Sequence, residues 1–182
     1  MKKLLLAAAT ALAFAPSAFA DRDNDNKFRL KLTGFQETPL TLSSPASGEF
    51  EATISRNDDS ITWELSYRGF PTDVLQAHIH FGQRAITGGI SIFLCSNLGN
   101  GPAGTLACPQ MGTIGGVITA ANVIGPAGQG IAPGELAEII AAIRAGAAYV
   151  NVHTKAFPGG EIRAQFHRKH PDRDRGHHGH DD

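Results

Sequence analysis

The sequence predicts an all-β protein: an antiparallel sandwich or flattened barrel of about seven to nine short strands with one short helix. Three observations support this fold class. Apolar and polar residues alternate over many short segments, which is the period of strands that bury one face. Clusters of turn-forming residues separate these segments at close spacing, as they do in antiparallel proteins. Only one segment repeats its apolar residues with the period of a helix.

The first part of the expected domain has the sequence pattern of three strands. Residues 28–32 alternate Phe and Leu with basic residues, whereas residues 34–47 contain two prolines and several Ser and Thr and are expected to be mostly loop. Residues 49–54 and 61–67 alternate on either side of a polar turn at residues 57–60. Two alternating runs around a tight turn predict a β-hairpin.

The middle of the chain predicts two more strands and a long loop. A strand is expected at residues 74–81, and a short apolar run follows at residues 90–94. Residues 99–134 hold ten glycines in 36 residues, with a short apolar piece at Val117-Ile118. Part of this segment is expected to be a long loop, because it lacks a sustained period.

One helix is expected near residues 134–145, and Gly146 stands where a helix C-terminus is expected. The apolar residues at positions i, i+3, i+4 and i+7 are Leu136, Ile139, Ile140 and Ile143. Strands at residues 148–154 and 161–166 complete the fold. In the last strand the side chains expected to face outward are Glu161, Arg163 and Gln165.

The N-terminus has the pattern of a secretory signal peptide at residues 1–20. Lys2 and Lys3 precede a short apolar run, and Ala18-Phe19-Ala20 is a small-x-small cleavage site. The mature protein is therefore expected to be periplasmic or secreted after cleavage near Ala20. No later stretch approaches the roughly 20 apolar residues of a membrane span, so none is expected.

The rest of the chain predicts one domain with two flanking segments. Residues 21–27 are polar and are expected to form a flexible lead-in, residues 28–166 form the domain, and residues 167–182 form a disordered, histidine-rich charged tail. Without Lys2 and Lys3 the chain has 14 basic and 17 acidic residues, a net charge of −3. Such a balance does not predict a nucleic-acid partner, which needs a basic surface.

Cys95 and Cys108 are the two cysteines of the chain. An even pair in an exported protein usually forms a disulfide, which we expect here. A thiolate metal site is the alternative, and the absence of any histidine between or near the cysteines in the sequence weighs against it.

Three histidines carry the main functional signal. His78 and His80 share one face of their predicted strand, and His153 shares a face with Tyr149 and Asn151 on another. Three neutral imidazoles that converge on one point form a transition-metal site with one coordination position open. Solvated histidines on the polar face of a strand are the alternative. The restriction of histidines to these two predicted strands favours the metal site, because no other histidine precedes residue 167.

Three neighbours of these histidines are candidate accessory residues. Glu161 is a candidate fourth ligand if the metal is zinc. Arg163 either attracts small anions to the metal or forms a surface pair with Glu161, which contributes little. Asn151 either fixes an imidazole tautomer or satisfies backbone groups. Glu37, a loop carboxylate, has no role that the sequence assigns.

The chain resembles the CHRD domain, a module first described in chordin and found singly in many exported bacterial proteins. The matching segments are LTGFQETP (32–39), AHIHFG (77–82), GVIT (116–119), GAAYVNVHT (146–154) and PGGEIR (158–163). The resemblance covers residues 28–166, nearly all of the expected domain.

The CHRD domain is in turn distantly similar to copper/zinc superoxide dismutase, which implies an immunoglobulin-like Greek-key sandwich. By this likeness His78, His80 and His153 match three copper ligands, and Arg163 loosely matches an arginine that guides superoxide. The chain departs from that enzyme because residues 81–152 contain no histidine, so the bridging histidine, the fourth copper ligand and the zinc loop are missing. This departure argues against dismutation more than against metal binding.

Three functions follow from these observations. The first is an exported protein that binds a transition metal through three histidines, with copper favoured over zinc by the affinity order of divalent ions. The second is a structural or adhesive extracellular module in which the histidines are framework. The third is a copper-only enzyme similar to superoxide dismutase. The tail offers either a second, weak metal-binding cluster or only a solvated segment; its histidines are His170, His177, His178 and His180.

Overall fold

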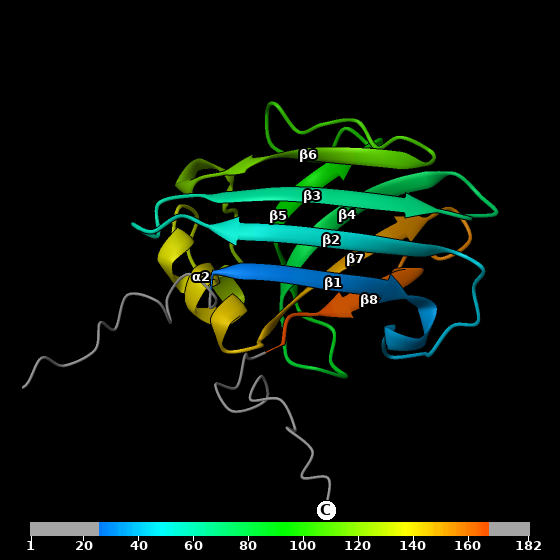
Figure 1. The fold of residues 1–182 in the computed structure, drawn as a ribbon, viewed down its shortest axis with the longest axis horizontal. Helices are drawn as coiled ribbons and strands as arrows, with labels where there is room; N and C mark the ends of the chain where they lie inside the picture. The colour runs from blue at the N-terminus through cyan, green and yellow to red at the C-terminus, as the bar shows by residue number, and fades with distance from the viewer. Residues whose placement is uncertain (1–25, 168–182) are drawn as a thin grey trace, which may run out of the picture.

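A computed structural model describes residues 26–167 of the chain (Figure 1). The expected signal peptide, most of the lead-in and the four histidines of the tail lie outside the described residues. Lys27, which we assigned to the lead-in, is already the first residue of a strand. No helix within the described range combines the length and the apolar character needed to cross a membrane.

The described residues form one sheet of eight antiparallel strands in the order β5-β4-β7-β8-β1-β2-β3-β6. The strands are β1 (Lys27–Thr33), β2 (Ser47–Ile54), β3 (Ile61–Arg68), β4 (Val74–Phe81), β5 (Gly89–Ser96), β6 (Gly112–Ile118), β7 (Ala148–Thr154) and β8 (Ile162–Gln165). Three 3-10 turns lie in the connections, η1 (Gly34–Gln36), η2 (Ala120–Asn122) and η3 (Ala127–Gln129), and one α-helix, α2 (Leu136–Arg144), precedes β7.

The sheet folds over itself into two layers. In Figure 1, β1, β2, β3 and β6 form the front layer, and β4, β5 and β7 cross behind them at an oblique angle. Strand β8 joins the layers, because it pairs with β7 along its length and with β1 at Arg163 and Thr33. The prediction of an all-β, antiparallel fold with one helix is confirmed, and the two layers belong to one continuous sheet rather than to two.

The apolar core lies between the two layers, where the inward side chains of the alternating strands meet. Phe50 of β2 stacks on Trp63 of β3 with ring centroids 6.3 Å apart and meets the edge of Phe166 at 6.0 Å. From the rear layer, Ile79 and Val150 are 1 % and 0 % exposed. Each such side chain contributes about 1.5–3 kcal/mol by leaving water, so period-2 alternation determines which face of each strand turns inward.

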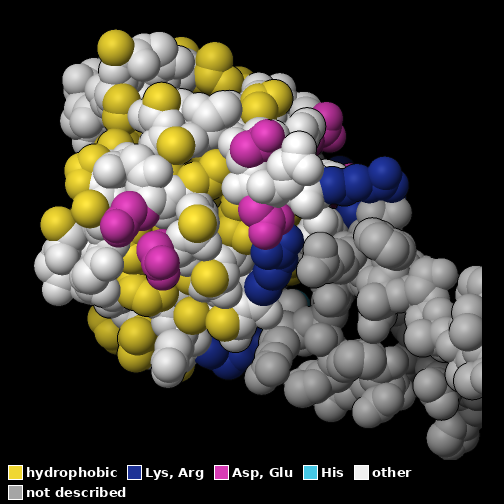
Figure 2. Space-filling model, turned by 90° about the vertical axis from the view of Figure 1, so that its left-hand side faces the viewer, with side chains coloured by type: hydrophobic (Ala, Val, Ile, Leu, Met, Phe, Trp, Pro, Cys, Tyr) yellow, Lys and Arg dark blue, Asp and Glu magenta, His cyan; other side chains and the backbone are white. Residues whose placement is uncertain are grey.

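Helix α2 lies at one end of the sheet, on the left in Figure 1, and packs against β7. Its apolar stripe is buried, as expected. The N–H of Gly146 donates to the carbonyl of Ile143 and the N–H of Ala147 to that of Ala142, which is the Schellman pattern, and Gly146 has a φ of +72°. The predicted helix stop is confirmed. On this end of the molecule, scattered hydrophobic side chains lie among a few acidic ones (Figure 2).

Strand β6 is longer than the sequence predicts. Residues 112–118 pair with β3 along its length, in a region that we expected to be in part a long loop, with only a short apolar piece at Val117-Ile118. Glycines concealed this strand, because they have no side chain to show alternation. One of them is required by packing: a Cβ on Gly115 would lie 2.7 Å from the carbonyl oxygen of Trp63.

The predicted disulfide is confirmed. Cys95 near the end of β5 and Cys108 in the following loop are bonded, with Cα atoms 5.1 Å apart. Between them, the side chain of Asn97 donates to the carbonyls of Val74 and Cys108 and accepts from the N–H of Cys108. The disulfide therefore holds the start of the long glycine-rich connection against the rear layer.

Candidate metal centre

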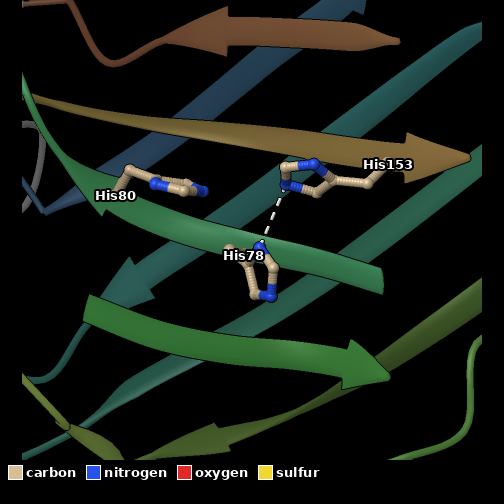
Figure 3. A group of neighbouring side chains, drawn as sticks. All are labelled: His78, His80 and His153. Atoms are coloured by element: carbon tan, nitrogen blue, oxygen red, sulfur yellow. Dashed lines mark hydrogen bonds between the residues drawn. The ribbon is translucent and has the colours of Figure 1, made fainter. Parts of the chain in front are cut away.

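The three histidines lie on one face of the rear layer because β4 and β7 are neighbours in the sheet. His78 is opposite Asn151, His80 is opposite Tyr149, and His153 is opposite Gln76. Residues two apart on a strand share a face, so the H-x-H pair of β4 and His153 of β7 project from the same side. Figure 3 shows His78 and His80 on one strand and His153 on its neighbour, with the rings turned toward one another.

This polar face is buried, and the expectation that it is open to solvent was wrong. The exposed fractions of His78, His80 and His153 are 0 %, 5 % and 6 %. The face continues onto β8 and the residue before it. Glu161, Arg163 and Gln165 were expected to point outward there and are 0 %, 2 % and 4 % exposed. Alternation identifies the side of a strand on which polar residues lie, but it cannot show whether loops cover that side.

Three connections cover the polar face and hydrogen-bond to it. The loop between β1 and β2 contributes Thr38 and Ser44, which bond to Arg163 and Glu161. The loop between β4 and β5 contributes backbone carbonyls to Arg163 and His80, and the turn between β7 and β8 contributes one to His153. Because the loops satisfy these polar groups, the face can be buried without leaving most of them unpaired.

Two of these backbone contacts determine the tautomers of His80 and His153. The Nδ1 of His80 lies 2.9 Å from the carbonyl oxygen of Gly88, and the Nδ1 of His153 lies 2.9 Å from that of Pro158. A carbonyl oxygen only accepts, so each Nδ1 carries the proton and each Nε2 presents a lone pair. A backbone carbonyl on the other nitrogen is the usual arrangement for a metal-binding histidine.

The lone pair of His153 faces the third histidine, His78. His78 Nδ1 lies 3.1 Å from His153 Nε2, and the ligand atoms of the three residues all lie within 4.8 Å of one another. Since His153 Nε2 is unprotonated, His78 Nδ1 donates to it. Two nitrogens that bind one ion at about 2.0–2.1 Å in tetrahedral geometry are about 3.3 Å apart. The pair of His78 and His153 already has this spacing, and His80 is the residue that has to move inward.

Two nitrogens of the cluster are buried without a hydrogen-bond partner: His78 Nε2 and His80 Nε2. Such a group costs about 1–3 kcal/mol when it is left unpaired in a native protein. An ion bound by the three residues would occupy the lone pair of His80 Nε2 directly. It would also displace the proton of His78 Nδ1 to Nε2. The His78 ring packs against the ring of Phe93, with centroids 4.4 Å apart.

Burial keeps all three imidazoles neutral. It lowers the pKa of His78 to about 2 and that of His80 to about 4, and it lowers the pKa of His153, because a charged ring would lose its hydration. The other two histidines lower the pKa of His78 further, whereas the Gly88 and Pro158 carbonyls partly oppose the shifts of His80 and His153. Neutral imidazoles are the form that binds a metal ion.

Arg163 lies near the cluster but not as an exposed guide for anions. Its Cζ is 3.5 Å from the ring centroid of Tyr149, and the other neighbour of this ring is His80, stacked on it at 4.7 Å. Because β7 lies between β4 and β8, Tyr149 receives the imidazole from one side and the guanidinium from the other. The guanidinium donates hydrogen bonds to Thr38, Gln83, Ile86 and Gln165. The alternative in which Arg163 and Glu161 form a surface pair is therefore wrong, because both side chains are buried.

Glu161 and Asn151 are both buried in the same face. The carboxylate of Glu161 accepts hydrogen bonds from the hydroxyls of Ser44 and Thr154, one on each oxygen. It therefore ties the β1–β2 loop to β7 and is not among the residues of the histidine cluster. Burial lowers the pKa of His80, and the nearby side chain of Asn151 acts to raise it. The Oδ1 of Asn151 is itself buried and makes no hydrogen bond.

Glu37 is the residue that sequence reasoning left without a role, and it lies beside Asn151. Its carboxyl is 5 % exposed, and Oε1 has no hydrogen-bond partner. A Cβ on Gly160 would lie 2.7 Å from both Glu37 Oε1 and Asn151 Nδ2, so both atoms face this glycine. Burial raises the pKa of Glu37 to about 7, against the effect of the Thr38 N–H and Arg163. Its place in the LTGFQETP segment was the available signal.

The comparisons with known proteins agree with this architecture. The family model of the CHRD domain matches residues 28–166, which include every strand apart from the first residue of β1, and all three histidines. No curated protein and no solved structure matches the chain.

Proposed function

This chain belongs to the CHRD domain family, and we propose that it is an exported protein that binds one transition-metal ion through His78, His80 and His153. Copper is the proposed ion. The observation that carries the proposal is the convergence of three neutral imidazoles whose ligand atoms lie within 4.8 Å of one another. Two of them are held in the metal-binding tautomer by backbone carbonyls.

The donor set favours copper over zinc. Imidazole suits both ions, and the usual affinity order places Cu²⁺ above Zn²⁺. A closed structural zinc site would need a fourth protein ligand that completes a tetrahedron, and the candidate was Glu161. Its two oxygens accept from Ser44 and Thr154 instead. Nothing in the cluster therefore reverses the affinity order.

Export is supported by the sequence of the first twenty residues and by the disulfide. The signal pattern ends at Ala18-Phe19-Ala20. The bond between Cys95 and Cys108 suits an oxidising compartment. The hypothesis of a copper-only dismutase has less support, because Arg163, which would guide superoxide, is 2 % exposed and hydrogen-bonded to the covering loops.

Metal analysis of variants tests the proposal. The parent is the full chain with the four tail histidines changed to asparagine, so that the tail binds no metal. We expect the parent to take up one Cu(II) per chain and His80→Ala to lose this stoichiometric uptake while keeping its β-sheet circular dichroism. His167→Ala is the matched control, because His167 is a histidine outside the cluster, and its uptake should equal that of the parent.

Two results would overturn the proposal. Equal copper uptake by His80→Ala would show that the histidines are framework, and the structural or adhesive module would then be the better reading. Failure of the folded parent to bind copper or zinc would do the same. A stoichiometric preference for zinc would keep the site and refute copper.

A further inference from the structure

A metal ion would bring positive charge to three ligands that carry no negative charge. The three histidines are neutral because burial lowers the pKa of each. The nearest buried cation, Arg163, lies against the same Tyr149 ring on which His80 stacks, and it makes the surroundings more positive. Burying an uncompensated charge is costly in a protein interior, so a divalent ion needs a negative group close by.

Two carboxyl groups are buried in this face, those of Glu161 and Glu37, and they differ in how many hydrogen bonds they accept. Both oxygens of Glu161 already accept hydrogen bonds from hydroxyl groups. Glu37 is 5 % exposed, and its Oε1 has no partner. The backbone N–H of Thr38 reaches only its other oxygen, at 3.4 Å. Glu37 is therefore buried without the hydrogen bonds that would stabilise a carboxylate.

The position of Glu37 is fixed from several sides. Gly160 has a φ of +130°, and a Cβ at this position would collide with the Glu37 carboxyl and with the Asn151 amide. The charged and titratable groups that act on Glu37 are Arg163 from β8 and Tyr149 from β7. Asn151 lies next to His80 on the same face. The carboxyl is thus separated from the histidine cluster by one amide side chain.

We propose that Glu37 supplies the negative charge of the metal site: it is a neutral carboxylic acid in the metal-free protein and becomes a carboxylate when a divalent ion binds to the three histidines. This inference rests on the proposed metal-binding function. The O–H bond of the carboxyl breaks, its proton passes to the solvent, and the buried region gains one net charge instead of two. A monovalent ion such as Cu(I) needs less compensation.

Calorimetric proton counting tests this assignment. Cu(II) is titrated into the full chain with the tail histidines changed to asparagine, at pH 6.0, in two buffers that differ in ionisation enthalpy. At this pH His78 and His80 have no proton to release, since their pKa values are about 2 and about 4, and the Nε2 of His153 accepts a hydrogen bond from His78. Glu37 is largely protonated, in line with its pKa of about 7. We expect about one proton released per Cu(II) bound, and about none in Glu37→Gln. The exposed Glu64→Gln is the matched control and should behave as the parent.

Competition with chelators specific for each oxidation state separates a charge effect from a folding defect. Glu37→Gln should lower the Cu(II) affinity about tenfold more than the Cu(I) affinity, because the divalent ion depends more on the carboxylate. Equal proton release by the parent and Glu37→Gln, or equal losses of Cu(I) and Cu(II) affinity, would refute the role of Glu37 and leave the three-histidine site intact. If neither the parent nor Glu37→Gln binds copper, the proposed function itself has failed, and this inference fails with it.

Discussion

The neutral, buried state of His80 predicts a specific pH dependence of stability in the metal-free protein. The pKa of His80 is about 4 in the folded protein, against about 6.5 in an unfolded chain. Between these values the unfolded chain binds a proton that the folded protein does not. The contribution of neutral His80 to the free energy of unfolding is therefore complete above pH 6.5 and is lost as the pH falls toward 4.

The magnitude follows from the pH interval. At pH 4.5 the unfolded state has gained about two pH units of protonation free energy, and each unit corresponds to about 1.36 kcal/mol, so His80 accounts for about 2.7 kcal/mol. Glu37 acts in the opposite direction, because burial raises its pKa to about 7 and its contribution to stability is therefore lost as the pH rises through 7. The total pH dependence is a sum of such terms, and a variant is needed to isolate one of them.

His80→Gln isolates the histidine, because glutamine does not titrate and its amide can donate to the Gly88 carbonyl. Urea unfolding of the metal-free chains, with a chelator present, is compared at pH 7.5 and pH 4.5. The parent should lose about 2–3 kcal/mol more than His80→Gln between these two values. The same loss in both proteins would mean that His80 is protonated in the fold at pH 4.5, which would refute its burial as a neutral ligand.

Two further predictions concern the groups that hold the site in place. Replacing Cys95 and Cys108 together by serine should lower the free energy of unfolding by about 3 kcal/mol, because the disulfide closes a loop with a sequence separation of 13; chemical denaturation measures this, and an unchanged midpoint would contradict it. Gly160→Ala should destabilise the fold by about 1–3 kcal/mol, since its backbone has a φ of +130° and the added Cβ would collide with Glu37 and Asn151. Gly159→Ala, where a Cβ meets nothing within 4 Å, is the matched control for thermal unfolding, and equal melting temperatures of the two variants would contradict the predicted collision.

Local patterns predicted most of the fold because each pattern corresponds to one physical cause. Alternation located the strands, since a strand buries every second residue. The spacing of Leu136, Ile139, Ile140 and Ile143, followed by Gly146, located the helix and its end. Strand β6 was underestimated because its glycines carry no side chain to alternate. Whether the two layers form two sheets or one depends on the pairing of Thr33 with Arg163, which joins residues far apart in the sequence.

The candidate site was predictable in its residues but not in its environment. H-x-H on one strand and His153 on another were expected to converge, and they do. Period-2 reasoning treats polar side chains as exposed, and here loops from three separate connections cover them. Glu37 could not be assigned for the same reason: its proximity to Asn151 arises because the β1–β2 loop folds over β7 and β8, and a one-dimensional pattern does not contain that contact.

The cost of the cluster argues that its histidines are more than framework. A core position is filled most stably by an apolar side chain of the right volume, because buried polar groups require partners. His78, His80 and Glu37 each retain a buried polar atom without a partner. Proteins tolerate such unfavourable local arrangements chiefly at functional sites, where stability is given up for binding or catalysis. A bound ion would recover part of this free energy through His80 Nε2, and ionisation of Glu37 would offset part of the ion's charge. One ligand thus accounts for the unpaired atoms of His80 and Glu37, whereas a purely structural role leaves each of them as a separate cost.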